Sequence, residues 1–314
     1  CNRPPFYQKD ISGIEPPEVT IHRYEVLLFT ANPFELAGTL QPRAAEFEVF
    51  LGESLHDPAA VSQLYEYVTD PLLKEIYLDV MDAIHELSDL EAGLQQAFRY
   101  LLYHFPEIRP PGVYTYISGL DYHHPVHYTG NELLIAIDMY LGADYPNYSQ
   151  IGMPAYLIRR TETCFMLPDA MRTIGWQLIA RQAQPPETLL DHMIFEGKLL
   201  YFLDATLPQL HDTLKIGYTN EQLSWMQSNL GAVWSYYLEN ELLFSSDHMM
   251  INKFIGEAPF TSTFSPESAP RTAAWLGWNI VRQYMKRNPD VDLGTLFRNA
   301  DSVKILQESR FRPA

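Results

Sequence analysis

Two helices predicted within residues 171–202 carry the pattern in this sequence that is closest to metal chemistry. The stretch MRTIGWQLIARQAQPPETLLDHMIFEGKLLYF predicts a helix, a Pro-Pro turn and a second helix that contains Glu196. In a zinc peptidase of this layout, the first helix supplies two histidines one turn apart with a glutamate between them, and the second helix supplies another glutamate. Here Ile174 and Leu178 stand one turn apart, and neither side chain can bind zinc. We therefore expect no metal, and treat Ile174, Leu178, Glu196 and the neighbouring His192 as the candidates for a vestigial site.

Glu196 itself has two interpretations. It is either a metal ligand, as a relic or in use, or a carboxylate paired with Lys198, His192 or a backbone donor. Burial of an unpaired carboxylate is costly, so either interpretation predicts a partner. We expect Gly197, the next residue, to permit close helix packing.

A second group of candidate ligands is the histidine-rich segment HHPVH, with His123, His124 and His127. Their spacing would suit chelation on a helix, but Pro125 and the flanking turn residues predict a loop, where spacing guarantees no geometry. A solvated loop is the simpler interpretation, and these histidines are weak candidates for a metal site. The segment DMYLGADYPNY offers Asp138 and Asp144 to calcium but lacks the regular oxygen spacing of an EF-hand.

The overall charge limits the class of partner. The chain has 314 residues, with 22 Lys+Arg against 39 Asp+Glu, and its formal net charge is -17. This charge repels phosphate backbones, so we expect no nucleic-acid partner. No apolar run approaches the roughly 20 residues that a membrane-spanning helix needs. Glycine-rich phosphate loops, Gly-x-Ser-x-Gly elbows and Cys-x-x-Cys pairs are absent from the sequence, so we expect no cofactor.

Cys1 suggests a lipid anchor. Processing of bacterial lipoproteins removes the signal peptide before a cysteine, which then carries the acyl chains, and two or three chains anchor a protein stably. We expect acylation, including palmitate, at Cys1, and a Pro-rich polar tether at residues 1–17. Cys164, the other cysteine, then has no intramolecular partner, and its neighbours Phe165 and Met166 suggest that it is a buried small hydrophobe.

The elements that would position these residues are mostly helical. We predict strands at 19–29, 110–119 and 131–142, the last two separated by a hairpin-like loop, and a helical region at 58–105 in which Leu73, Ile76, Tyr77, Val80 and Ile84 form one stripe. The other predicted helices are 44–52, 153–160, 168–183, 186–204, 220–244, 247–255, 267–288 and 294–308. The expected fold class is α+β, predominantly helical, with a small β-sheet. Without an evident linker, residues 18–314 are predicted to form a single domain.

Aromatic residues at near-helical spacing crowd the C-terminal half. They are Trp234, Tyr237, Trp275, Trp278 and Tyr284, and Leu238 shares the spacing of the first two. An aromatic stripe of this kind usually forms core, although some of these rings could instead line a groove for a peptide, a glycan or an envelope protein.

Several phrases in order resemble the GldB family of gliding-motility-associated lipoproteins. They are YTYISG, LLIAIDMYLGADYPNY, MIFEGKLLYFLDATLP, IGYTNEQLSWMQSN, VWSYYLENELLFSSD, FIGEAPFTSTF, PRTAAWLGWNIVRQYM and ILQESRFRP, and the resemblance extends from Ile21 to Pro313. The resemblance implies an acylated Cys1, an envelope lipoprotein required for gliding, and distant similarity to predicted zinc-dependent peptidases, hence a zincin-like core.

Together these features predict a non-catalytic protein. We expect a lipid-anchored, periplasm-facing component of the bacterial cell envelope that acts through contacts with other envelope proteins on a degenerate metallopeptidase scaffold. One alternative is a divergent zinc metallopeptidase that uses Glu196 with His192 or with histidines of the 123–127 loop. The other is a ligand- or glycan-binding module with an aromatic-lined pocket.

Overall fold

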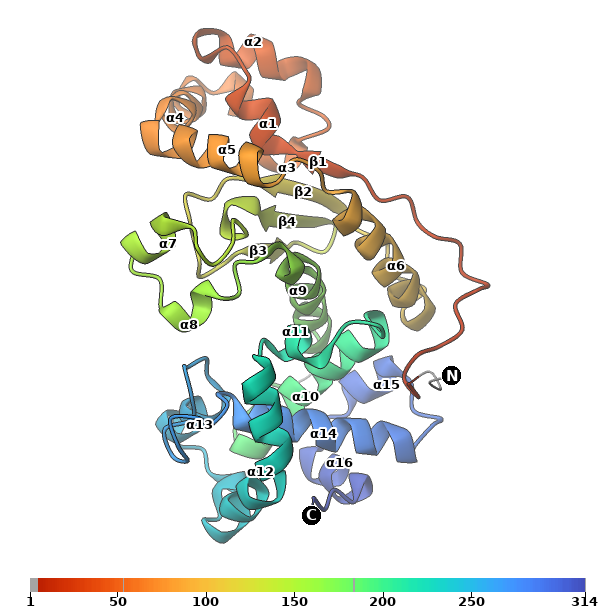
Figure 1. Ribbon diagram of the computed structural model, residues 1–314. Helices are drawn as coiled ribbons and strands as arrows, with labels where there is room; N and C mark the ends of the chain where they lie inside the picture. Colours follow the sequence, from red (N-terminus) through yellow and green to blue (C-terminus); the bar gives the residue numbers. More distant parts are fainter. Residues whose placement is uncertain (1–4, 53, 183, 314) are drawn as a thin grey trace. The chain divides into compact units, whose positions relative to one another are not determined.

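A computed structural model describes residues 5–52, 54–182 and 184–313 (Figure 1). The chain divides into two units by its internal contacts. The sheet unit comprises Pro16–Gln96 and Arg109–Ala170, and the helical unit comprises Cys1–Glu15, Ala97–Ile108 and Met171–Ala314. The expected fold class, α+β with helix predominating and one small sheet, is confirmed.

The sheet has four strands, β1 (Ile21–Arg23), β2 (Gly112–Tyr116), β3 (Val126–Tyr128) and β4 (Glu132–Ala136), in the order β1-β2-β4-β3 (Figure 1). The strands predicted at 110–119 and 131–142 are confirmed as β2 and β4, but the second is wrong beyond Ala136, because Ile137–Met139 forms a 3-10 helix. The hairpin predicted between them is wrong, because β2 and β4 are parallel. The intervening segment contains β3, which forms the antiparallel hairpin with β4.

The strand predicted at 19–29 is also wrong beyond its first half. Only Ile21–Arg23 is strand, and Tyr24–Phe29 forms helix α1. Packing explains the difference, because tertiary contacts override β-propensity. Tyr24 stacks on Phe50 with ring centroids 4.1 Å apart, and the buried Glu25 accepts hydrogen bonds from Arg23 Nε at 2.6 Å and Thr115 Oγ1 at 2.8 Å.

Short helices make up the rest of the sheet unit. They are α2 (Leu36–Leu40), α3 (Glu48–Leu51), α4 (Pro58–Thr69), α5 (Pro71–Ala83), the first part of α6 (Ser88–His104), α7 (Pro146–Gln150) and α8 (Ala155–Ile158). The helical region predicted at 58–105 is interrupted between α4 and α5, where the Asp70 side chain accepts the Leu72 and Leu73 N–H groups and Pro71 takes the first helical position.

The helical unit contains α9 (Met166–Ala180, from Met171 on), α10 (Leu189–Thr206), α11 (Asp212–Ile216), α12 (Asn220–Glu239), α13 (His248–Ile255), α14 (Thr272–Arg287), α15 (Leu293–Arg298) and α16 (Ser302–Ser309). Residue 183, the predicted end of the helix at 168–183, lies outside the described residues. Helix α10 begins after the Pro-Pro turn with a capping box between Thr188 and Asp191.

Helices α10 and α14 cross closely at the centre of the helical unit (Figure 1). A Cβ atom on Gly197 would overlap the carbonyl of Gly277, and one on Gly277 would overlap the carbonyl of Met193. The expectation that Gly197 permits close packing is therefore confirmed. The rings of the predicted aromatic stripe are core, because every one of them is buried: Trp234, Tyr237, Trp275, Trp278 and Tyr284. Leu238, predicted to lie with them, is instead 48% exposed.

Candidate functional site

The two positions where a zinc peptidase would carry histidines are packed into the core of the helical unit. Ile174 is fully buried and Leu178 is 8% exposed, both on α9. Between them Gly175 lies so close to α10 that an added Cβ atom would stand 2.5 Å from the ring of Phe202 and 3.1 Å from Leu199. Such a contact fixes the two helices side by side, so Ile174 and Leu178 act here as packing residues.

Glu196 on α10 is held by two arginines from other helices. Its Oε2 atom accepts a hydrogen bond from Arg172 Nη2 at 2.6 Å and from Arg271 Nη2 at 2.8 Å. The sequence suggested Lys198, His192 or a backbone donor as partners. Lys198 instead donates to the backbone carbonyl of Asn299 at 2.6 Å. The Glu196 carboxylate thus ties α10 to α9 and to the start of α14.

The electrostatics of this cluster keep Glu196 ionised. Burial raises the pKa of the Glu196 carboxyl, but the nearby Arg172 and Arg271 outweigh that cost and hold the pKa below its ordinary value. Arg271 is 5% exposed and also lies 3.3 Å from Glu257 Oε1. A carboxylate so engaged is an anchor for two cations.

The backbone conformation of Arg271 also indicates that this arginine is fixed in place against Glu196. Arg271 has a left-handed conformation with φ of 52° at the residue that caps α14, which costs a non-glycine residue about 1 kcal/mol. Its guanidinium donates to the Ile216 carbonyl at 2.8 Å as well as to Glu196. These contacts offset the backbone cost and fix the guanidinium against the carboxylate.

His192, the remaining vestigial candidate, lies one turn before Glu196 on α10 and is half-buried. Burial lowers the pKa of its imidazole, and the neighbouring His248 acts in the same direction against the carboxylates of Asp191 and Glu196. His192 is therefore neutral near pH 7, but the pair of His192 and Glu196 alone does not make up the ligand set of a zinc site.

The three histidines of the HHPVH segment lie in the sheet unit and are exposed. His123 and His124 have ring centroids 6.3 Å apart, and His124 and His127 have centroids 5.8 Å apart. The prediction of a loop is correct for His123 and His124 and wrong for His127, which lies on β3. Over residues 5–52, 54–182 and 184–313, no three His, Cys, Asp or Glu side chains form a group that could hold a metal ion.

Asp138, weighed as a calcium ligand, is completely buried and is used inside the protein. Its carboxylate accepts the backbone N–H groups of Ser118, at 2.9 and 3.0 Å, and of Leu120, at 2.8 Å, together with the Ser118 hydroxyl. Gly119 and Leu120 have φ of 75° and 66°, so the turn after β2 forms a concave nest of N–H groups around the carboxylate. Burial raises the pKa of Asp138, and these hydrogen bonds oppose the rise.

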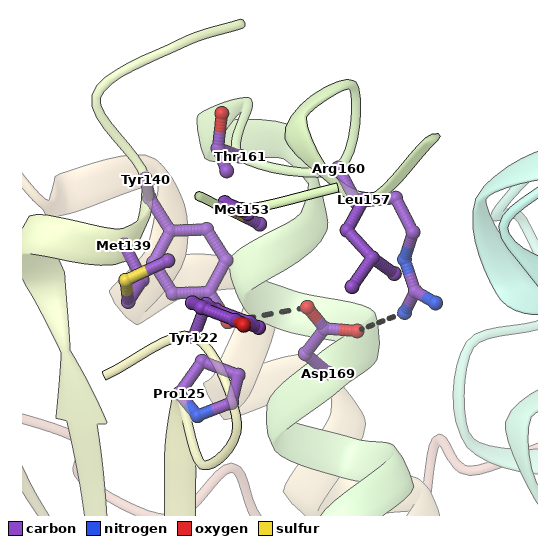
Figure 2. A pocket seen from close by; sticks show the side chains of 9 residues that line it. All are labelled: Tyr122, Pro125, Met139, Tyr140, Met153, Leu157, Arg160, Thr161 and Asp169. Atoms are coloured by element: carbon purple, nitrogen blue, oxygen red, sulfur yellow. Dashed lines mark hydrogen bonds and ion pairs between the residues drawn. The ribbon is translucent and has the colours of Figure 1, made fainter. Parts of the chain in front are cut away.

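Beside this nest the sheet unit has a pocket of about 140 Å³. Figure 2 shows Tyr122, Pro125, Met139 and Tyr140 on one side of the pocket, and Leu157, Arg160 and Asp169 on the other. Met139 and Tyr140 follow the carboxyl end of β4, the edge where parallel sheets commonly bind ligands. Sequence reasoning missed this pocket, because it placed Met139 and Tyr140 inside the strand predicted at 131–142, whereas β4 ends at Ala136.

The polar side of the pocket is a linked set of three side chains. The Tyr140 hydroxyl donates to Asp169 Oδ2 at 3.2 Å, and Arg160 Nη2 donates to Asp169 Oδ1 at 3.0 Å (Figure 2). Burial is the main cause that raises the pKa of Tyr140, and the Asp169 carboxylate adds to it. The pocket therefore offers a largely apolar cavity with a neutral phenol and a fixed ion pair at its edge, which suits binding of a small group.

Comparison with known proteins assigns the chain to one family. The sequence profile of the family described as gliding motility protein GldB matches residues 6–313, so the chain belongs to this family of lipoproteins. A lipoprotein of this kind is a lipid-anchored protein of the cell envelope. Searches of curated proteins and of solved structures each found no match. Among the helices of the described residues, none combines the length and the apolar character needed to cross a membrane.

Proposed function

We propose that this chain is a non-catalytic member of the GldB family, tethered to the membrane on the periplasmic side, that acts in gliding through contacts with other envelope proteins. One observation carries the non-catalytic part. Glu196, the acidic residue that a zinc peptidase of this helix order would use, is engaged by Arg172 and Arg271, while Ile174 and Leu178 are core. The order of helices shared with zinc peptidases then reflects a degenerate zincin-like scaffold.

The tether in this proposal is lipid carried by Cys1, a residue outside the described part of the chain. Membership of a lipoprotein family supports acylation of a cysteine. The other cysteine of the chain, Cys164, lies on a short 3-10 helix within the folded sheet unit, far from Cys1 in the sequence. Its thiol is exposed, which corrects the expectation of a buried small hydrophobe. Two or three acyl chains give stable anchoring, because each buried CH₂ contributes about 0.8 kcal/mol.

Large apolar side chains on the surface support the role of protein contacts. Phe34 and Met249 are 83% and 85% exposed, and Phe244 and Leu78 are each 64% exposed. Phe244 ends a 3-10 helix that precedes α13, and Met249, five residues later, lies in the first turn of α13. Exposed Phe and Met side chains are enriched where proteins bind each other.

The test separates an anchoring carboxylate from a catalytic one. A gliding bacterium that lacks its own family member would be complemented with the wild-type chain, Glu196→Gln, Arg172→Gln and the double variant. Glu196→Gln removes the negative charge between the buried Arg271 and the partly buried Arg172, so we expect lower protein abundance and reduced gliding. Removing the Arg172 charge as well relieves part of this repulsion, so the double variant should recover both.

A catalytic glutamate predicts a different pattern. Glu196→Gln and the double variant would both fail to glide at wild-type abundance, while Arg172→Gln would glide. Stoichiometric zinc in tag-free protein, lost on Glu196→Ala, would also overturn the proposal in favour of a divergent metallopeptidase that uses Glu196 with His192.

A second candidate function is ligand binding in the pocket of Figure 2, and the lining by Tyr122 and Tyr140 favours it. A volume of about 140 Å³ accommodates one ring or one apolar side chain rather than a long glycan. Titration with small aromatic and sugar probes, followed by NMR or calorimetry, tests this function. Saturable binding that is abolished by Leu157→Trp, which would fill the pocket, would establish it, and absence of binding would reject it.

A further inference from the structure

Residues 5–15, directly after the first four residues of the chain, are packed on the helical unit. Arg99 on α6 donates from Nε to the Ile14 carbonyl and from Nη2 to the Ile11 carbonyl, both at 2.9 Å. Ile11 is 7% exposed, and Gln8 Oε1 accepts a hydrogen bond from Gln209 at 3.0 Å. A freely moving tether would make none of these contacts, so this segment, called here the docked segment, extends the fold almost to Cys1.

Tyr7 packs the docked segment against Lys215 and Arg282, two cations of a buried charge network. Its ring centroid lies 5.3 Å from Lys215 Nζ and 5.7 Å from the guanidinium carbon of Arg282, within the range of cation–π attraction. Phe6 and Tyr7 also contact the ring of Tyr201, at centroid distances of 6.3 and 6.5 Å. The two rings therefore have fixed positions on α10 and α14.

Around Phe6 and Tyr7 the surface has the composition of a membrane interface. A cavity of about 300 Å³ is lined by Phe6, Tyr103, Lys9 and Lys286 among others. Phe6 and Tyr103 are 43% and 42% exposed, and both lysines are exposed. Aromatic rings and lysines together favour the headgroup layer of a bilayer, where a ring lies in the apolar region and an amine reaches phosphate.

The acidic side chains on this surface do not prevent contact with lipid headgroups. Asp290 and Asp292 also line the cavity, so its charge is balanced rather than positive. The Asp292 carboxylate accepts the Thr295 N–H at 2.6 Å, which engages one of its lone pairs. Approach to a bilayer therefore depends on the lipid anchor and the rings, with the lysines as headgroup partners.

The two units also differ sharply in charge. The helical unit has 16 Lys+Arg and 18 Asp+Glu, for a net charge of -2, and the sheet unit has 6 and 21, for -15; together they give the -17 of the chain. Anionic lipids repel a strongly acidic surface and tolerate a nearly neutral one. The docked segment belongs to the unit that the bilayer can approach.

We propose that the surface made by the docked segment and its cavity, called here the anchor face, lies against the lipid headgroups. This rests on the lipid at Cys1 in the proposed function. Four residues of any conformation span at most about 14 Å from Cys1 to Pro5, so the docked segment holds the anchor face at the bilayer. The membrane is thus a partner of one defined face of the helical unit.

Lysine acetylation read by mass spectrometry tests the anchor face. The lipidated protein would be reconstituted into vesicles of phosphatidylethanolamine and phosphatidylglycerol and compared with the soluble Cys1→Ser variant mixed with the same vesicles. Lys9 and Lys286 report on the anchor face, and Lys253 and Lys304, exposed on the same unit, serve as matched controls. We expect acetylation of Lys9 and Lys286 to fall about threefold, which corresponds to occlusion in about two thirds of molecules, while the controls do not change.

Two variants show that the docked segment causes the protection. Replacing Phe6 and Tyr7 by Ala removes the ring contacts, and inserting about 12 Gly and Ser residues before Pro5 adds roughly 20 Å of reach. We expect both to restore acetylation of Lys9 and Lys286 while the protein stays bound to vesicles. Because the insertion leaves every docked contact intact, its result does not depend on folding.

The outcomes separate this proposal from the proposed function. Equal acetylation of all four lysines in the lipidated and soluble proteins, or protection of Lys253 and Lys304 instead, would overturn the anchor face while leaving the lipid anchor in place. A mass spectrum of the membrane-extracted protein that shows unmodified Cys1 would overturn the anchor of the proposed function, and the anchor face with it.

Discussion

The buried charge network under the docked segment makes a quantitative prediction for Asp204→Asn. Asp204 on α10 is completely buried and accepts hydrogen bonds from Lys215 Nζ at 2.9 Å, from Trp278 Nε1 at 2.8 Å and from Arg282 Nε and Nη2, both at 2.7 Å. Lys215 has no exposed side-chain surface, so its charge is balanced inside the protein. The substitution keeps the shape of the side chain and removes its charge.

The expected cost follows from the number of donors that lose an acceptor. Each oxygen of Asp204 accepts two of the four hydrogen bonds, so replacing either oxygen by the NH₂ group of asparagine leaves two of the four N–H donors facing another donor. Removing one partner of a buried ion pair costs about 3–5 kcal/mol, because the other charge stays buried without compensation. Arg282 keeps Asp212, which it contacts at 2.8 and 2.9 Å, so we expect about 4 kcal/mol of lost stability, borne mainly by Lys215.

Asp212→Asn is the matched control. Its carboxylate contacts the same Arg282 but is 28% exposed, and Arg282 retains Asp204 in this variant. Solvent screening reduces the cost to about 1 kcal/mol. Urea unfolding at pH 7, followed by circular dichroism, measures both variants, and the transition of the helical unit is the one compared. A loss below about 1 kcal/mol for Asp204→Asn, or equal losses for the two variants, would refute the reasoning that burial of Lys215 sets the cost.

Three further variants or conditions give independent checks. Gly277→Ala forces α14 away from the Met193 carbonyl and should cost about 3 kcal/mol or more by overpacking, whereas Gly38→Ala, where an added Cβ atom meets open space, should change the urea midpoint little. The pKa of Glu196 is below its ordinary value in the folded protein. Its contribution to stability is therefore present above the unfolded pKa of about 4.3 and is lost as the pH falls below it. Urea unfolding between pH 5 and 3 should show this loss of stability in the wild type and a smaller loss in Glu196→Gln. Burial, and secondarily Lys9, lowers the pKa of His104 from 6.5 to about 4. Protonation therefore favours the unfolded chain, and the free energy of unfolding should fall by about 1–3 kcal/mol from pH 6.5 to pH 4. His104→Gln should remove this dependence on pH, and an unchanged dependence would assign it to other groups.

Periodicity in the sequence predicted most of the helices, because they have one face that packs in the core. Ile76 and Val80, on the predicted stripe of α5, are fully buried. Strand pairing was less accessible, since the parallel pairing of β2 with β4 depends on contacts between segments that β3 and its flanking loops separate in the sequence. The switch from β1 to α1 depends on Tyr24 stacking on Phe50, a contact that no local pattern contains.

The candidate site likewise has one part that the sequence predicts and another that it does not. The absence of ligands at Ile174 and Leu178 follows from the residue types alone. The partners of Glu196 do not, because Arg172 lies 24 positions before it and Arg271 lies 75 positions after it. An arginine reaches a carboxylate through the fold, and the sequence places no signal at either end of such a contact.

Glu196 and Asp138 show together why acidic residues in this chain are poor guides to metal sites. A carboxylate has about four lone-pair positions. Asp138 accepts two backbone N–H groups and one hydroxyl from Ser118 and Leu120, and Glu196 accepts from two guanidinium groups. A divalent cation would have to displace these donors and leave buried N–H groups or arginine charges without partners, which costs several kcal/mol in each case. The two carboxylates are therefore fixed as internal joints, one between the ends of two strands and the other between three helices, and the binding chemistry of this protein is to be sought in the pocket beside Asp138 and on its surfaces.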